Sequence, residues 1–186
     1  MILVGIGHRD GVGKSTFANL LRKHLGGHGV EIHPFADEVK RVCVDLFRPL
    51  GLKGAAYYES FPQEKDQPLP CGKTPRDIWK AVGDGMRDIW GDVWWERNKS
   101  LLGVNRSLAV IIPDVRKMNE VEYITRQGGW MIEVDNPRVP SLPGKSFSEL
   151  GDYQGWKRRI ENSGNLHELA AKAKKLAAEI LSSLNS

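Results

Sequence analysis

Apolar residues in this chain form short continuous runs and, between them, longer stretches with helical spacing. The runs have the length of buried strands and predict strands over residues 2–7, 30–36, 108–112 and 130–134. The spaced stretches predict helices over residues 15–25, 37–50, 74–91 and 119–127, and from about residue 165 onward. Strands that alternate with helices predict an α/β fold with an open parallel sheet. In such folds, ligands bind outside the carboxyl ends of the strands.

Two stretches show neither pattern. Residues 51–74 are interrupted by proline and glycine, and residues 136–155 are typical of a loop. The helix that follows the first stretch starts well, because Thr74 is a favourable N-cap and Pro75 suits the first helical position. The last helix carries one apolar stripe, which we expect to face the core: Leu166, Leu169, Ala173, Leu176, Ile180 and Leu184.

The segment HRDGVGKST joins the first predicted strand to the first predicted helix, which is the context of a phosphate-binding P-loop. Gly11 and Gly13 let backbone N–H groups approach phosphate oxygens without interference from a Cβ atom, and the helix dipole favours the anion. Lys14 is expected to reach the β- and γ-phosphates, and Ser15 to offer its hydroxyl to Mg²⁺. The predicted ATP-phosphate-binding residues are Gly11, Val12, Gly13, Lys14, Ser15 and Thr16.

Two aspartates follow predicted strands at the same sheet edge. Asp114 ends the apolar run AVIIPD, and we expect it beside the metal, through water; the alternative is an aspartate that caps a turn. Asp37 follows the second predicted strand and is a candidate catalytic residue, either as a contact to Mg²⁺ or as an acceptor of the proton of an attacking hydroxyl. A helix cap is an equally good interpretation of Asp37, and both roles are compatible.

Composition narrows the possible partners. The chain has 186 residues, and 27 Lys and Arg against 23 Asp and Glu give a formal net charge of +4. The sequence pI of about 9.1 favours anionic partners, which include nucleotides, nucleic acid and acidic surfaces. No apolar run approaches the roughly 18–20 residues of a membrane span, so we expect no membrane partner. The two cysteines, Cys43 and Cys71, cannot form a disulfide framework, which indicates a reducing, cytoplasmic location.

Several segments together resemble bacteriophage-type deoxynucleoside monophosphate kinases. The segment PDVRKMNE over residues 113–120, followed by GGW at 128–130, is similar to their "DVR…NE…GG" pattern, and FADEVK at 35–40 to their "FAD-x-x-K" pattern. TPR at 74–76 resembles the start of their acceptor helix. NSGNL at 162–166 resembles a terminal segment that they share with dephospho-coenzyme A kinases.

The resemblance implies one P-loop kinase domain over residues 1–186, with a five-stranded parallel sheet, an acceptor-binding segment over about 51–103 and a short lid over about 136–155. It implies phosphoryl transfer from ATP, with Mg²⁺, to a deoxynucleoside monophosphate. It also assigns residues, by position: Arg76, Arg87 and Glu120 to the acceptor, Arg116 to the acceptor or the transferring phosphoryl group, Arg138 and Lys145 to the lid, and Asn162 and Gly164 to the adenine side. For the basic residues, the alternative is an ordinary solvated side chain.

The chain departs from the family pattern in places that concern the acceptor. Ser15 stands where many relatives have aspartate, Ser146 where they have histidine, and His8 where a P-loop usually has glycine. One alternative is therefore a kinase of the same fold that phosphorylates a hydroxyl, on a small metabolite or on a hydroxymethylated base in DNA, as a 5-hydroxymethyluracil DNA kinase would. Four tryptophans near the acceptor segment, at positions 79, 90, 94 and 95, could stack on bases, although core packing is favoured for any one of them. A second alternative is a nucleotide-binding regulator without kinase activity. If the chain is encoded by a phage, the location is the host cytoplasm.

Overall fold

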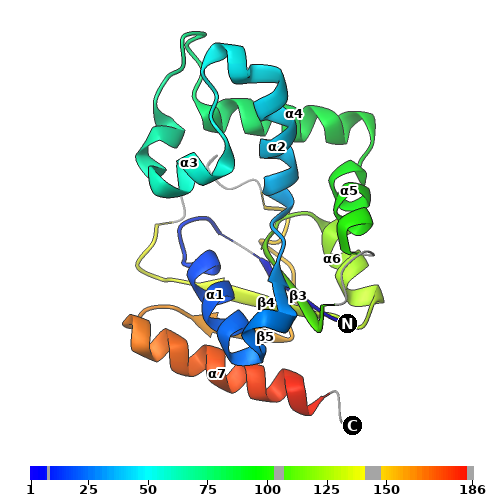
Figure 1. The fold of residues 1–186 in the computed structure, drawn as a ribbon. Coiled ribbons are helices and arrows are strands. Elements are labelled where there is room, and N and C mark those ends of the chain that lie inside the picture. The colour runs from blue at the N-terminus through cyan, green and yellow to red at the C-terminus, as the bar shows by residue number, and fades with distance from the viewer. Residues whose placement is uncertain (8, 103–106, 141–147, 184–186) are drawn as a thin grey trace. The chain divides into compact units, whose positions relative to one another are not determined.

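The chain folds into two compact units. The computed structural model describes residues 1–7, 9–102, 107–140 and 148–183 (Figure 1). Unit 1 consists of Met1–Pro34 and Asn105–Ser186, and unit 2 of Phe35–Val104. Unit 2 contains the expected acceptor segment but begins earlier, at Phe35. Among the described helices, none has both the length and the apolar character needed to cross a membrane.

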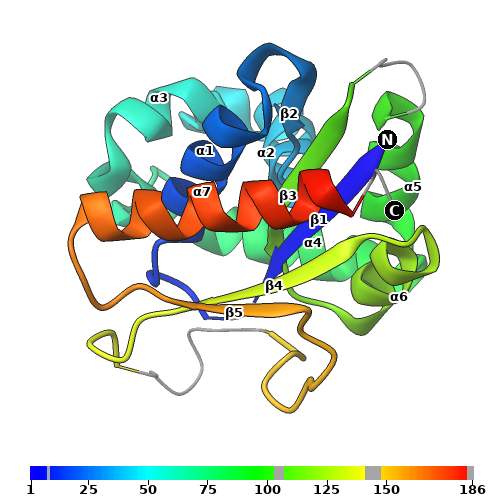
Figure 2. The same cartoon turned by 90° about the horizontal axis from the view of Figure 1, so that it is seen from below.

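Unit 1 contains the sheet. Its five strands are β1 (Ile2–Gly7), β2 (Val30–Ile32), β3 (Ala109–Val115), β4 (Trp130–Asp135) and β5 (Arg158–Glu161). They lie in the order β2-β3-β1-β4-β5, and all four neighbouring pairs are parallel (Figures 1 and 2). The prediction of an α/β fold with a five-stranded parallel sheet is therefore confirmed.

The pleat of β1 divides its side chains between two layers of helices. Alternate residues, including Val4 and Ile6, join the core beneath α1 (Lys14–Leu25) and α7 (Leu166–Ser182), which cover one face of the sheet (Figure 2). The other face is covered by α6 (Met118–Arg126), whose Ile124 reaches within 2.7 Å of where a Cβ on Gly5 would lie. Burial of both faces explains why β1 is a continuous apolar run.

The third strand extends past the proline at which the apolar run ends. β1 pairs Gly5 with Ile112 but Gly7 with Val115, so β3 holds one extra residue between these pairs. This bulge contains Pro113, which has no N–H to donate to a ladder. The prediction of a strand ending at residue 112 was therefore too short, and Asp114 lies inside β3 rather than after it.

The second strand is shorter than predicted, and this moves Asp37. β2 ends at Ile32, and α2 (Phe35–Phe47) begins directly after Pro34. The buried residues Phe35, Val39 and Cys43 have helical spacing, so helix packing decides the conformation here. Asp37 does not end a strand, and it does not cap the helix either: it lies within the first turn of α2.

Two further differences concern exposed positions. β5 was not predicted from the pattern, because its sequence RRIE exposes three of its four residues, as a polar edge strand does. In α7 the stripe from Leu169 to Ile180 is buried as predicted, but Leu166 is 63% exposed at the first helical position. Leu184 lies outside the described residues.

Unit 2 is helical. Its α-helices are α2, α3 (Ala55–Ser60), α4 (Pro75–Ile89) and α5 (Val93–Leu102), with 3₁₀ turns at Arg48–Leu50 and Pro62–Asp66. Short helices thus occupy much of the stretch in which the sequence shows no pattern. Thr74 caps α4 as predicted: its side chain accepts a hydrogen bond from the Asp77 N–H, and the Asp77 carboxylate accepts one from the Thr74 N–H. The core of the unit is built by Val39, Cys43, Leu52, Tyr58, Ile78 and Trp94.

Candidate active site

The phosphate loop connects β1 to α1, as predicted. Gly11 has φ +76° and Gly13 φ +94°, a left-handed backbone that residues with a Cβ adopt at a cost. Gly13 also has no room for a side chain, because a Cβ there would lie 2.4 Å from Nδ2 of Asn162. The loop therefore needs glycine at position 13 for two independent reasons.

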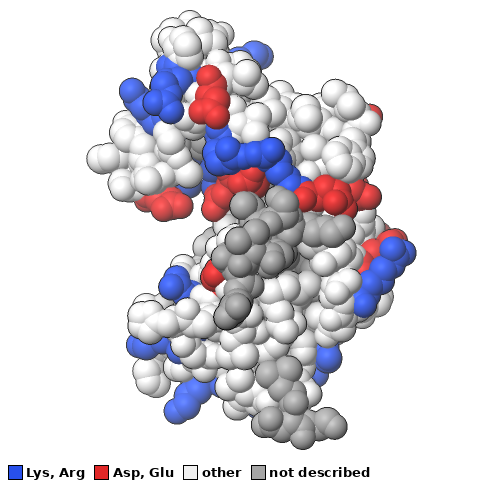
Figure 3. Space-filling view, turned by 45° about the vertical axis from the view of Figure 1, so that its right-hand side comes forward, with Lys and Arg blue, Asp and Glu red and all other residues white. Residues whose placement is uncertain are grey.

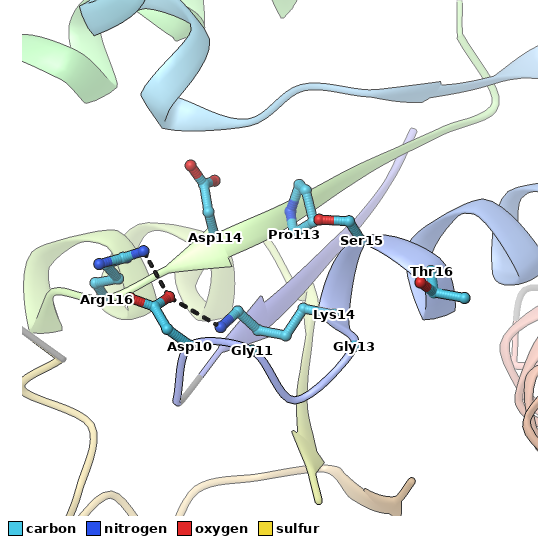
Figure 4. A pocket seen from close by; sticks show the side chains of 9 residues that line it. All are labelled: Asp10, Gly11, Gly13, Lys14, Ser15, Thr16, Pro113, Asp114 and Arg116. Atoms are coloured by element: carbon cyan, nitrogen blue, oxygen red, sulfur yellow. Dashed lines mark hydrogen bonds and ion pairs between the residues drawn. The ribbon is translucent and has the colours of Figure 1, made fainter. Parts of the chain in front are cut away.

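Two cations meet at one carboxylate beside this loop. The Arg116 guanidinium donates a hydrogen bond to Oδ1 of Asp10 at 2.7 Å, and the Lys14 ammonium lies 3.7 Å from the same oxygen (Figure 4). Lys14 also donates a hydrogen bond to the Arg9 carbonyl. The two cations come from α1 and from the end of β3, so the sheet brings together residues that are far apart in sequence.

The environment of Lys14 alters its acidity. The residue is only 8% exposed, and burial lowers the pKa of its ammonium group below the ordinary value. Asp10 opposes this change in pKa, Arg116 adds to it, and Asp114 opposes it. Asp10 therefore stabilises a buried cation that would otherwise lose its proton more easily.

The same residues line a cavity of about 330 Å³, together with Ser15, Thr16 and Asp114. Asp114 projects from β3, and the Ser15 hydroxyl points toward the end of that strand (Figure 4). A hydroxyl and a carboxylate oxygen fit Mg²⁺, which takes one or two protein oxygens and completes its shell with water and phosphate. In the described part of the chain, no three His, Cys, Asp or Glu residues form a group that could hold a metal ion by themselves.

Glu120, which the resemblance assigns to the acceptor, has a carboxylate that binds the backbone next to Arg116. The side chain is buried, and its Oε2 accepts hydrogen bonds from the N–H groups of Arg116 and Lys117 at 2.7 and 3.0 Å. Glu120 thus holds the backbone from which the Arg116 side chain projects, while Asp10 holds the guanidinium. Arg116 is positioned from both ends.

Of the residues predicted for the adenine side and the lid, Asn162 contacts the loop. Asn162 donates a hydrogen bond from Nδ2 to the Val12 carbonyl at 2.9 Å, so it supports the loop backbone. Gly164 precedes α7, and a Cβ at this position would collide with the Glu168 carboxylate. Arg138 is exposed on a turn that follows β4, and Lys145 lies outside the described residues, as does His8.

The other predicted residues belong to unit 2, where each lies beside a residue of opposite charge. Arg76 lies at the start of α4 and forms two hydrogen bonds with the Asp66 carboxylate, at 2.8 and 3.3 Å. Arg87 is near the end of α4, 3.4 Å from Asp84. Asp37 forms an ion pair with Lys40 at 2.7 Å. Arg76 and Arg87 share one helix, as the spacing predicts.

No model of a known protein family matches the chain. A protein of Acanthamoeba polyphaga mimivirus that carries the provisional name deoxynucleotide monophosphate kinase is 32% identical over 158 residues, which cover 76% of this chain and 77% of that protein. The chain belongs to this kinase family. Among solved structures, shikimate kinase from Aquifex aeolicus is similar over 96% of each chain, with a TM-score of 0.44 and 15% identity.

The chain is therefore a P-loop kinase, a phosphotransferase, as the sequence predicts. Sequence reasoning did not single out Asp10 in its site. Asp10 occupies a variable position of the P-loop pattern, and its partner Arg116 lies 106 residues away. Only the pairing of β1 with β3 brings the two together, so no local signal could have identified Asp10.

Proposed function

We propose that this kinase transfers the γ-phosphoryl group of ATP, with Mg²⁺, to a deoxynucleoside monophosphate and forms the diphosphate. The observation that carries the proposal is the convergence of Lys14 and Arg116 on one point of the phosphate-loop cavity. The name of the mimivirus relative supports the choice of acceptor.

Two positioned cations suit this reaction, because phosphoryl transfer depends mainly on positioning and on neutralisation of charge. Lys14 and Arg116 now share the Asp10 carboxylate, and phosphate oxygens would take over as their partners. Ser15 and Asp114 would hold Mg²⁺, which, when bound, supplies further positive charge to the phosphate oxygens. A 5′-phosphate acceptor is already anionic, so Asp37 is not required as a base.

The acceptor is assigned to unit 2, through Arg76 and Arg87. A guanidinium that already forms two parallel hydrogen bonds with a carboxylate, as Arg76 does with Asp66, presents the geometry that also suits a phosphate. Arg87 contributes a second cation on the same helix.

The structure weakens the basis of the DNA alternative. Trp94 is 2% exposed and donates a hydrogen bond to the Gly83 carbonyl at 2.9 Å, and Trp95 is also buried. These rings belong to the interior of unit 2, whereas Trp90 is 55% exposed. On the face drawn in Figure 3, acidic side chains lie beside the basic ones in the upper and middle part of the view, and the basic side chains near the lower edge are scattered, so the described residues form no continuous basic surface for a polyanion there.

A comparison of acceptors, each offered separately, tests the proposal. Radiolabelled ATP with Mg²⁺ is offered to each deoxynucleoside monophosphate, and separately to hydroxymethyl-modified single-stranded and duplex DNA. We expect label in one or more free nucleotides, and complete loss of transfer with EDTA. If label enters the DNA but no free nucleotide, the proposed acceptor is wrong and the enzyme phosphorylates a hydroxyl on DNA.

Variants assign the roles of the cations. Lys14→Ala and Arg116→Ala should each lower kcat by about 10²–10³. Arg126→Ala is the matched control, since Arg126 is 76% exposed and pairs with Glu122, one turn away on the same helix. Wild-type kcat in either cavity variant would remove that residue from the mechanism.

The acceptor residues need a different readout. Arg76→Ala and Arg87→Ala should weaken use of the acceptor by roughly 10–150-fold and leave the KM for ATP unchanged. Arg48→Ala, which removes an exposed cation of unit 2, is the control. An effect confined to ATP would contradict the assignment of these arginines to the acceptor.

A further inference from the structure

Arg9, a residue of the phosphate loop, binds the segment that follows β4. Its Nε donates a hydrogen bond to Oδ1 of Asp135 at 3.0 Å, and its NH2 group pairs with the same carboxylate. The guanidinium also donates to the carbonyls of Val139, at 2.7 Å, and Asn136, at 3.1 Å. One side chain thus connects the loop to a segment about 130 residues away in sequence.

The two carbonyls that Arg9 binds are the two ends of a turn. The Val139 N–H donates to the Asn136 carbonyl at 3.0 Å, and the Arg138 N–H donates to Oδ1 of Asn136, also at 3.0 Å. The turn also lies close to Gly11 of the loop, because Val139 Cγ1 would be 3.6 Å from a Cβ built on that glycine. Arg9 therefore holds both ends of the turn that carries Arg138.

The backbone of Arg9 is connected to the phosphate site as well. Its carbonyl accepts a hydrogen bond from the Lys14 ammonium. Phosphate oxygens that bind the Lys14 ammonium would compete with the Arg9 carbonyl for it. Without this hydrogen bond, the backbone at residue 9 would be able to shift. The guanidinium, which is largely shielded from water, would carry such a shift to the turn.

We propose that Arg9 is a positioning residue that couples the phosphate loop to the turn from Asn136 to Val139, so that nucleotide binding at the loop changes the stability of the turn. The nucleotide-dependent part of this inference rests on the proposed function. The coupling itself does not, because its contacts are formed by the protein's own side chains and backbone.

Hydrogen exchange of the nucleotide-free protein tests the coupling. Arg9→Ala should speed exchange of the Arg138 and Val139 amides by roughly tenfold or more, because charge-assisted hydrogen bonds to the turn are lost. In the opposite direction, Asp135→Asn should speed exchange in the loop at residues 10–13. Arg9→Lys should be intermediate, since an ammonium can pair with Asp135 but lacks the planar fork that reaches both carbonyls.

Arg159→Ala is the matched control. Arg159, on β5, forms an ion pair at 3.0 Å with Glu133 of β4, the strand that also contains Asp135, and it donates a hydrogen bond to the Gln154 side chain; Glu133 and Gln154 both lie outside the loop and the turn. It should leave exchange at residues 138 and 139 as in the wild type. Unchanged exchange at these amides in Arg9→Ala, or an equal increase in the control, would overturn the coupling.

The nucleotide-dependent part is measured with the β,γ-imido analogue of ATP and Mg²⁺. In the wild type the analogue should slow exchange at residues 14–16 and change the exchange rate at 138–139; in Arg9→Ala it should act only at 14–16. An unchanged rate at 138–139 in the wild type, or a change there that persists in Arg9→Ala, overturns transmission through Arg9. Absence of any slowing at 14–16 in the wild type contradicts the proposed nucleotide site, and leaves the coupling to be decided by the nucleotide-free measurement.

Discussion

Replacement of Gly13 by alanine should destabilise unit 1 by an amount that the structure allows us to divide into two parts. The left-handed backbone at φ +94° costs an alanine about 1–2 kcal/mol. The new Cβ would also meet Asn162 Nδ2 at 2.4 Å and displace the amide that donates to the Val12 carbonyl, which costs about 0.5–1.5 kcal/mol more. The expected loss in the free energy of unfolding is therefore about 1.5–3.5 kcal/mol.

Urea unfolding of four variants separates the two parts: Gly13→Ala, Gly128→Ala, Asn162→Ala and the double variant Asn162→Ala/Gly13→Ala. Gly128→Ala is the control for backbone strain, because Gly128 has φ +71° and open space around its Cα, and it should cost about 1–2 kcal/mol. In an Asn162→Ala background, Gly13→Ala should cost no more than Gly128→Ala does. The reasoning is refuted if Gly13→Ala in the otherwise wild-type chain is no more harmful than Gly128→Ala.

Three other predictions concern single side chains. Burial lowers the pKa of Lys14, so between that lowered pKa and 10.5 the unfolded chain binds more protons than the folded chain. The free energy of unfolding of the wild type should therefore rise with pH over this window, relative to that of Lys14→Met. Urea unfolding without nucleotide measures both. A parallel pH profile for the two proteins would show that Lys14 ionises as in the unfolded chain. Thr74→Ala removes the N-cap of α4 and should lower stability by about 0.5–2 kcal/mol in thermal unfolding, whereas Thr74→Ser should lose little. Burial raises the pKa of the Cys43 thiol to about 11, so a thiol reagent at neutral pH should modify exposed Cys71 quickly and Cys43 only on unfolding. Rapid modification of both thiols in the folded protein would contradict this.

The sequence by itself determined the features that depend on neighbouring residues. The P-loop could be predicted because the glycines, Lys14 and Ser15 act through a single turn between a strand and a helix. Strands buried on both faces, such as β1, are recognisable because every residue is apolar. The cap of α4 is likewise local, since Thr74 and Asp77 are three residues apart.

The hydrophobic pattern failed to predict elements whose conformation depends on contacts with residues distant in sequence or on exposure to solvent. β5 is a polar edge strand, so nothing in its composition marks it; its existence depends on pairing with β4. The continuation of β3 through Pro113 depends on a bulge against β1, which accommodates a residue that cannot donate. Asp37 belongs to a helix because the apolar residues around it have a core to pack against.

The arrangement of charges in the site was decided by tertiary structure alone. Residue type predicted that Lys14 and Arg116 are important, but not that Asp10 would lie between them. The same holds for the contact of Arg9 with the turn after β4. These interactions form because parallel strands deliver their carboxyl ends to one edge of the sheet, where residues more than one hundred positions apart come within hydrogen-bond distance.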